Sequence, residues 1–300
     1  MSNNEAEQMS SAKLMWKMTR PHTLTATFAP VILGTVMAMS VTKIDWVMFL
    51  AMMLACLCLQ IATNLFNEYY DFKRGLDTAE SVGIGGGIVR HGLQPKNVIA
   101  VALALYVIAA IIGVYICMNS SYWLVVIGLF GMAVGYLYTG GPLPIAYTPF
   151  GELFSGVLMG AGFVLISYFI QTDAITLNSV LISLPIAILV GAINMSNNIR
   201  DIEEDIVGGR RTLPILLGRD KAISALAFAF IVSYVWIVVL VFMQIVSPWA
   251  FVAFISVFKP IQAIRAFRQG QHMRAAMKST ALTNTLFSFL LAIGLWIAQL

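Results

Sequence analysis

Two segments with the same spacing of amides and carboxylates are the part of this sequence best suited to chemistry. The first runs from Asn64 to Asp71 and the second from Asn194 to Asp201, and each reads Asn-x-x-Asn-x-x-x-Asp. Oxygen ligands of this kind suit Mg²⁺, which also bridges phosphate oxygens. With the residues just downstream, the segments hold eight of the fourteen carboxylates, namely Glu68, Asp71, Asp77, Glu80, Asp201, Glu203, Glu204 and Asp205. We therefore expect a metal–phosphate site.

Helical geometry sorts these carboxylates by direction. Successive residues turn by ~100°, so the four polar positions of either segment share one face of a helix. Asp205 joins that face in the second segment, whereas Glu203 points away and is expected at the surface. Gly75 occupies the matching position in the first segment. We expect this glycine to end the helix and let Asp77 turn back towards Asp71.

The elements that must position these side chains are membrane helices. Of the 300 residues 59% are hydrophobic and 11% charged, and the mean hydropathy is +0.85, whereas soluble domains are about a quarter charged. Apolar runs long enough to cross a ~30 Å hydrocarbon core predict nine spans. They lie near 22–41, 45–68, 97–117, 122–139, 150–170, 178–199, 221–243, 247–267 and 279–298. The expected fold class is an all-α integral membrane protein.

The distribution of basic residues predicts the orientation of this bundle. If the N-terminus is cytoplasmic, every lysine and arginine except Lys43 falls in an inner segment, as the positive-inside rule requires. The C-terminus is then outside, and both acidic segments lie on the cytoplasmic side of a bacterial inner (plasma) membrane. Basic loops also explain the pI of about 9.0, so membrane lipid is an expected partner and nucleic acid is not.

The chain is expected to form a single domain. Residues 1–12 are predicted to be a disordered tail, and residues 13–300 a membrane domain with cytoplasmic loops near 70–96 and 200–220. These loops carry the basic side chains that a diphosphate would need. Arg90 follows a glycine-rich run at 83–87 whose backbone amides suit an anion, although a loop without any ligand is the open alternative. The diphosphate candidates are Lys73, Arg74, Arg90, Arg210 and Arg211.

Both acidic segments resemble motifs of one enzyme family, the UbiA superfamily of intramembrane prenyltransferases. The first Asp-rich motif, in the form found in the menaquinone branch, is similar to Asn67-Glu68-Tyr69-Tyr70-Asp71-Phe72-Lys73-Arg74-Gly75-Leu76-Asp77. The second resembles residues 197–205 followed by 209–213. Stretches at 20–24, 138–142 and 151–152 are similar to members that prenylate 1,4-dihydroxy-2-naphthoate. One departure is Glu68, where many members carry Asp.

The resemblance implies a fold and a reaction. Nine helices would surround a central cavity, with the two motifs facing each other across its cytoplasmic mouth. More than one Mg²⁺ ion would bind a polyprenyl diphosphate there, and its tail would enter an apolar groove. After the allylic bond ionises, the naphthoate ring would attack, with loss of CO₂ and diphosphate, to give demethylmenaquinone. The resemblance thus implies an Mg-dependent 1,4-dihydroxy-2-naphthoate polyprenyltransferase.

The resemblance also assigns roles to individual residues. Asp71, Asp201 and Asp205 would be catalytic. Together with Asn67, Glu68, Asp77, Asn197 and Asn198 they would hold the metal. Asn64 and Asn194 would orient these ligands. Candidates for the acceptor site are Arg20, His22, Tyr70 and Tyr138, for which an interfacial arginine, a structural histidine and an interfacial aromatic belt are the alternatives.

Two other functions compete with this interpretation. A member of the same superfamily with another acceptor, such as a benzoate, a haem, a chlorophyll precursor or a glycerol phosphate, is the nearer one. The segments at 20–24, 138–142 and 209–213 favour the naphthoate. A cation-coupled transporter also builds polar sites from related repeats. Both motifs, however, lie at the cytoplasmic end and not near the midplane, which argues against transport.

Overall fold

A computed structural model describes residues 11–76, 86–270 and 273–300, except for the side chains of residues 11–13 and 22. Every regular element in these ranges is a helix. The helices that form the two polar segments and the cavity around them are α2 (Thr25–Met39), α3 (Trp46–Lys73), α5 (Pro95–Asn119), α6 (Trp123–Leu137), α7 (Gly151–Ser155), α8 (Phe163–Thr172), α9 (Leu177–Arg200) and α10 (Ile202–Val207). A π-helical stretch, η3 (Gly156–Gly162), joins α7 to α8.

The remaining elements surround this group. Three helices of 12 to 25 residues close the other side of the bundle, namely α12 (Arg219–Phe242), α13 (Phe258–Gln269) and α14 (Met273–Ile297). The others are short, namely α1 (Ser11–Met18), α4 (Gly87–His91), α11 (Leu213–Leu217) and the 3₁₀ turns η1 (Pro21–Thr23), η2 (Ile145–Tyr147) and η4 (Pro248–Val257).

Helical segments lie at each predicted apolar run within the described residues. Seven are long and apolar enough to cross a membrane, by length and composition: 46–73, 95–119, 151–172, 177–200, 219–242, 248–269 and 273–297. The two other predicted spans correspond to the shorter apolar helices α2 and α6. Each has 15 residues, or about 22 Å at 1.5 Å per residue, which is less than the ~30 Å of the hydrocarbon core. The all-helical class is confirmed; the count of nine spans and the orientation stay predictions.

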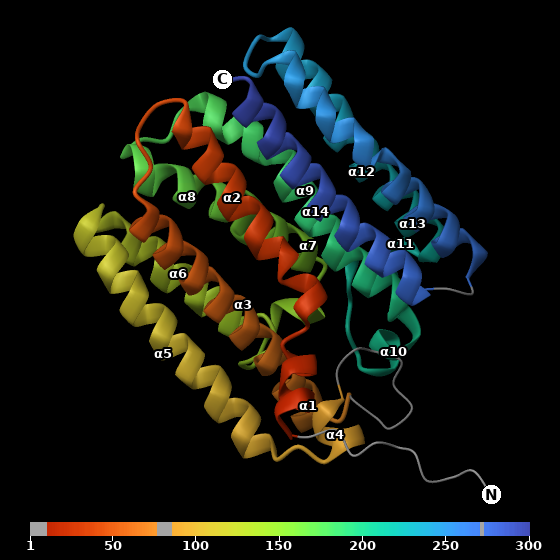
Figure 1. Ribbon diagram of the computed structural model, residues 1–300. Helices are drawn as coiled ribbons and strands as arrows, with labels where there is room; N and C mark the ends of the chain where they lie inside the picture. The colour runs from red at the N-terminus through yellow and green to blue at the C-terminus, as the bar shows by residue number, and fades with distance from the viewer. Residues whose placement is uncertain (1–10, 77–85, 271–272) are drawn as a thin grey trace, which may run out of the picture.

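The long helices pack side by side (Figure 1). Helix α2 contacts α14 and α8, while α3 contacts α5, and α9 contacts both α12 and η3. The largest buried cluster joins α2, α8, α9, α12, α13 and α14. The short helices α1, α4 and α10 lie at one end of the bundle, and the C-terminus lies at the other. The ends of α3 and α9 that carry the polar segments face the end with the short helices.

The two polar segments end in different ways. Gly75 follows α3 with φ +71°, and the Leu76 N–H donates to the Asp71 carbonyl at 2.9 Å. This is the predicted glycine end, because glycine adopts positive φ without a Cβ clash. Helix α9 stops at Arg200, and Asp201 links it to α10. The Asp205 N–H still donates to the Asp201 carbonyl at 2.8 Å, so Asp205 keeps nearly its predicted direction.

Candidate active site

The ends of α3 and α10 meet through Arg210. Its guanidinium donates to Asp71 Oδ1 at 2.7 Å and to Asp205 Oδ1 at 2.9 Å. The same guanidinium lies over the ring of Tyr147, 5.3 Å from its centroid. A cationic group therefore already stands between the carboxylates of the two polar segments. A charge-assisted bridge of this kind is short and directional.

Asp205 lies in a setting where its charge is costly. The residue is buried, and burial raises the pKa of its carboxyl group to about 6, with nearby Asp201 and Asp71 adding to the rise and Arg210 opposing it. Its second oxygen, Oδ2, is buried and accepts no hydrogen bond from the described residues. Burial lowers the pKa of Arg210, but Asp71 and Asp205 outweigh this and raise it. An additional cation at Asp205 would relieve its burial cost.

The rest of the second segment divides between the cavity and the surface. Asp201 lines the cavity, where both of its oxygens accept hydrogen bonds from Arg200 at 2.6 and 2.5 Å. Asn197 also lines it, and Asn198 donates to Glu152 Oε1 at 2.8 Å. The Glu203 side chain is 73% exposed and pairs with Arg219, which confirms its predicted outward direction.

In the first segment, Asn67 and Asp71 line the cavity. Asn67 Oδ1 accepts a hydrogen bond from the Thr139 hydroxyl at 2.8 Å. Asn64 donates to the Thr19 carbonyl at 2.8 Å, which ties α3 to the chain before η1. Asp77 lies outside the described residues. The segment thus contributes one carboxylate and two amides to the described wall.

Glu68 is not brought together with the other expected ligands. It is 2% exposed, and its carboxylate accepts from the backbone N–H groups of Gly86 at 2.9 Å and Ile88 at 3.2 Å. These bonds place Glu68 against the start of α4 and not in the cavity wall. The N-terminal N–H groups of a helix lack internal partners, so a carboxylate there satisfies them. The spacing of residues along α3 does not predict these hydrogen bonds of Glu68, because their donors lie on another element.

The five basic candidates for diphosphate binding lie in different surroundings. Arg210 lines the cavity, while Lys73 and Arg211 are exposed. Arg74 donates to the carbonyls of Thr139 and Gly141 and lies over the rings of Tyr70 and Tyr147, so it holds the loop that follows α6. The Arg90 guanidinium lies so close over Gly86 that a Cβ at this glycine would clash with it.

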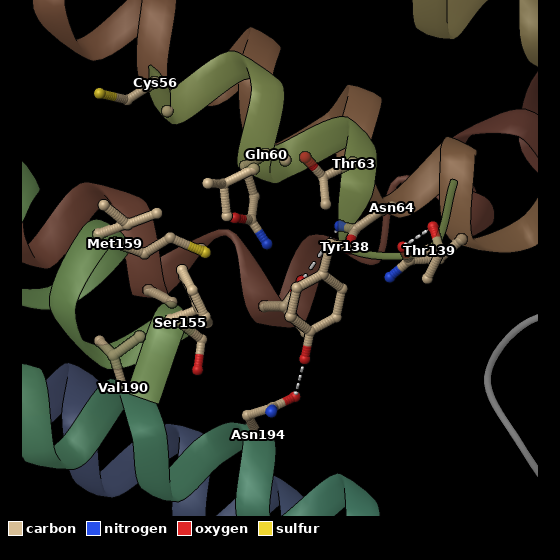
Figure 2. A pocket seen from close by; sticks show the side chains of 18 of the residues that line it. Cys56, Gln60, Thr63, Asn64, Tyr138, Thr139, Ser155, Met159, Val190 and Asn194 are labelled. Atoms are coloured by element: carbon tan, nitrogen blue, oxygen red, sulfur yellow. Dashed lines mark hydrogen bonds between the residues drawn. The ribbon is translucent and has the colours of Figure 1, made fainter. Parts of the chain in front are cut away.

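Between these helices runs a cavity of about 390 Å³ (Figure 2). Its mouth carries the charged residues Asp71, Asp201, Glu204, Asp205, Arg200 and Arg210. Its inner part is lined by apolar side chains of α3, α5, α6 and α8, including Met52, Cys56, Ile116, Leu124 and Ile166. A charged mouth above an apolar interior suits a ligand with an anionic head and a hydrocarbon tail.

The four acceptor candidates lie in different places. Arg20 lines the cavity, with φ 53° at the start of η1. The Tyr138 hydroxyl donates to Asn194 Oδ1 at 2.9 Å across the cavity wall (Figure 2). Tyr70 is not among the lining residues, and its hydroxyl lies 2.7 Å from that of Tyr136. The His22 side chain is outside the described part of the structure.

Several residues that the fold brings to this site have no role predicted from the sequence. Thr139 donates to Asn67, the Tyr147 ring lies under Arg210, and Glu152 accepts from Asn198. The spacing of residues in the sequence does not predict these contacts, because each joins segments that lie apart along the chain. Gln60 lines the cavity below Asn64. It continues the same face of α3 at positions 60, 64, 67 and 71, so the helical spacing held a signal for it.

The described residues contain no group of three or more histidine, cysteine, aspartate or glutamate side chains placed to hold a metal ion by themselves. Two carboxylates with neighbouring amides are nevertheless enough for Mg²⁺, which keeps several waters and takes further ligands from substrate phosphates. The unpartnered Asp205 Oδ2 and the carboxylate and amide donor set therefore fit this ion.

Comparison with known proteins agrees with this geometry. The family model for the UbiA prenyltransferase family matches residues 27–291. The chain is 65% identical, over 97% of its length and 95% of the relative, to a 1,4-dihydroxy-2-naphthoate octaprenyltransferase of Bacillus subtilis (strain 168). A protein of the same name from Mycobacterium tuberculosis is 29% identical, over 94% of this chain and 96% of the relative.

Solved structures agree on the fold. A UbiA homolog from Aeropyrum pernix K1 superposes with a TM-score of 0.65 at 17% identity, over 93% of this chain and 98% of that one. A UbiA homolog from Archaeoglobus fulgidus, bound to GPP and Mg²⁺, also has a TM-score of 0.65, at 14% identity over 95% and 99% of the two chains. At these identities the likeness concerns the arrangement of the helices alone.

Proposed function

This chain belongs to the UbiA prenyltransferase family, and we propose on that premise that it transfers a polyprenyl group to 1,4-dihydroxy-2-naphthoate. The donor is an allylic polyprenyl diphosphate, and the other products are CO₂ and diphosphate. Demethylmenaquinone is formed in its reduced, quinol form, as a step of menaquinone biosynthesis. The observation that carries this assignment is the 65% identity to the naphthoate octaprenyltransferase over nearly the whole of both chains.

The metal site that we propose is built around Asp71 and Asp205. Asp201, Asn67, Asn197 and Asn198 complete the set with direct or water-mediated contacts, and Asp77 is a further candidate outside the described residues. Mg²⁺ bound there would neutralise charge on the diphosphate and so favour its departure. The support is that Asp71, Asp201 and Asp205 line the same cavity as Asn67 and Asn197.

Arg210 is our first candidate for the diphosphate itself. Its guanidinium holds Asp71 and Asp205 in the structure, and a planar fork of donors also suits phosphate oxygens. We infer that Arg210 turns from the carboxylates to the diphosphate when the donor binds. Lys73 and Arg90 are secondary candidates. Arg74 has its donors on backbone carbonyls, so we assign it to the loop, and Arg211 stays a weaker candidate.

The cavity supports the order of the chemical events. The diphosphate leaves at the charged mouth while the hydrocarbon tail lies among the apolar side chains below it. The cavity walls limit the access of water, which protects the allylic cation from hydrolysis. The ring carbon that bears the carboxylate then bonds to the allylic carbon, and the carboxylate leaves as CO₂ with its bonding electrons restoring the aromatic ring. Arg20 is a candidate contact for the naphthoate carboxylate.

The protein is a multi-pass membrane protein with seven candidate spans. We propose that α2 and α6 also cross the membrane, which gives nine spans with the N-terminus inside and the C-terminus outside. The mouth of the cavity then faces the cytoplasm of a bacterial cell, where the water-soluble naphthoate is available. Residues 13–300 form one prenyltransferase domain in this proposal. Nearly all the basic residues fall on the side assigned to the cytoplasm.

One assay tests the proposed reaction. Membranes from a host that lacks this activity, with and without the protein, receive a polyprenyl diphosphate, Mg²⁺ and one of several acceptors: dihydroxynaphthoate, a hydroxybenzoate or a glycerol phosphate. We expect a prenylated, decarboxylated naphthoquinol by mass spectrometry with the first acceptor alone. Transfer to another acceptor without transfer to the naphthoate contradicts the assignment.

A further inference from the structure

Gln60 is a buried polar residue inside the cavity. It lies on α3, four residues before Asn64, and it is 8% exposed. Its side chain lines the cavity together with the apolar side chains of Cys56, Met159 and Val190 (Figure 2). Its carboxamide forms no hydrogen bond with any described residue. A membrane-embedded enzyme thus holds an amide with two donors and one acceptor against a largely apolar space.

Nearby polar side chains of the cavity already have partners. Asn64 donates to the Thr19 carbonyl, Asn67 accepts from Thr139, and Tyr138 donates to Asn194. Of the other neighbours, the Tyr106 hydroxyl donates to the Met132 carbonyl, and Ser155 donates to the Glu152 carbonyl. Asn194 keeps its buried Nδ2 unpaired but has its oxygen bonded, whereas the carboxamide of Gln60 has neither its oxygen nor its nitrogen bonded to a described residue.

We expect a buried amide in this position to form a hydrogen bond with a bound ligand. Buried polar groups are costly unless they are hydrogen-bonded, and this applies with more force at membrane depth. The substrates of the proposed reaction offer four kinds of group. The diphosphate belongs at the charged mouth, the prenyl tail has no hydrogen-bonding atoms, and the naphthoate carboxylate is assigned to the cation Arg20. The hydroxyl groups of the aromatic ring remain, and a hydroxyl both donates and accepts, as a carboxamide does.

We propose that Gln60 positions the aromatic acceptor through a hydrogen bond with one of its ring hydroxyls. This inference rests on the proposed function and adds a specificity-determining residue to it. Gln60 precedes Asp71 by eleven residues on the same face of α3, which is roughly 16 Å along the helix axis. That interval leaves room for the diphosphate at the mouth and for a bicyclic ring beneath it, between the allylic carbon and Gln60.

The bond also explains how the enzyme selects its acceptor. A site built to bond a hydroxyl rejects an analogue that lacks it, because the amide is then left unpaired. The apolar side chains beside Gln60 contact the ring without regard to its polar substituents. Gln60 therefore supplies directional recognition one helical turn deeper than Asn64, where its amide lies among apolar side chains of the cavity wall.

The first test is Gln60→Met, which keeps nearly the same length and removes the hydrogen bond. We expect the KM for dihydroxynaphthoate to rise about tenfold or more, as for the loss of one buried hydrogen bond, while the KM for the polyprenyl diphosphate stays unchanged. The matched control is Gln262→Met, at an exposed glutamine of α13, with both KM values unchanged. Gln60→Asn, which retains a shorter amide, replaces the methionine variant if that variant does not fold.

The second test uses naphthoates with a single hydroxyl as competitive inhibitors of the wild type and of Gln60→Met. Between 1-hydroxy-2-naphthoate and 4-hydroxy-2-naphthoate, we expect one to lose about tenfold in affinity in the variant and the other to be unaffected. Equal affinities of both inhibitors for the two proteins overturn the proposal, as does a rise in the KM for the diphosphate alone. Failure of the proposed function is a separate result, because then the wild type itself does not prenylate the naphthoate.

Discussion

Asp71 and Asp205 lie on separate halves of the chain and share a single guanidinium, since Arg210 donates to both at 2.7 and 2.9 Å. A positive group therefore stands at the position where the spacing of the polar segments predicted a metal ion. The two carboxylates would repel each other without it. We infer that Arg210 maintains the site between turnovers and that the incoming metal and diphosphate take over its contacts.

Removing either carboxylate should abolish most of the activity. We expect Asp71→Asn and Asp205→Asn to lower product formation by about a hundredfold or more, since each loses charge stabilisation of the departing diphosphate. Thermal unfolding shows whether the variants are folded. Glu203→Gln is the control, because this exposed pair with Arg219 contributes little. Activity near wild type in either aspartate variant excludes that residue from the metal site.

The role of Arg210 is testable against that of a neighbouring arginine. Arg210→Met should raise the KM for the polyprenyl diphosphate and lower kcat, because the donors for the phosphate oxygens are lost. Arg210→Lys should restore part of the loss, since it keeps the charge without the planar fork. Arg219→Met, which removes a surface ion pair, should change neither constant. An unchanged KM for the diphosphate in Arg210→Met contradicts the proposed contact.

Mg²⁺ and protons should compete at Asp205. Its carboxyl group has a pKa of about 6, so the group takes up a proton as the pH falls through this value and can no longer bind a cation. We expect activity to decline below about pH 6, and higher Mg²⁺ concentrations should move this decline to lower pH. Initial rates measured over pH at several Mg²⁺ concentrations check the prediction. If the pH at which activity declines does not change with the Mg²⁺ concentration, Asp205 does not bind the metal.

Glu68 should act on stability and not on the metal. In Glu68→Gln one of the N–H groups of Gly86 and Ile88 loses its acceptor, so we expect a lower unfolding temperature and a loss of about 1–3 kcal/mol. The Mg²⁺ concentration for half-maximal activity should stay the same. If that concentration rises severalfold in the variant, Glu68 is a metal ligand as the motif alone implied.

Arg74 should likewise behave as a structural residue. Arg74→Leu leaves the carbonyls of Thr139 and Gly141 without their donor, and we expect a loss of about 1–3 kcal/mol in unfolding free energy. The KM for the polyprenyl diphosphate should change less than in Arg210→Met. Differential scanning fluorimetry together with steady-state kinetics separates the two effects. A rise in KM equal to that of Arg210→Met assigns Arg74 to the diphosphate instead.

Much of the architecture could be predicted from local periodicity. Hydrophobic runs placed the long helices, since a helix in lipid must be apolar over its length. The same 3.6-residue repeat put Asp205 inward and Glu203 outward, and Gly75 marked the end of α3 because glycine adopts the positive φ found there without a Cβ clash. The helices α2 and α6 are shorter than the apolar runs at 22–41 and 122–139 in which they lie, because the ends of helices depend on the loops that connect them.

The sequence by itself determined the helices, the shared face of the two polar segments and, through its resemblance to a family, the chemistry. Only the tertiary structure decided which groups are partners. It set Arg210 between Asp71 and Asp205, turned Glu68 to α4, and left Gln60 without a partner in the cavity. The reason is physical: helical direction follows from neighbours in sequence, whereas a hydrogen bond between segments far apart depends on how whole helices pack.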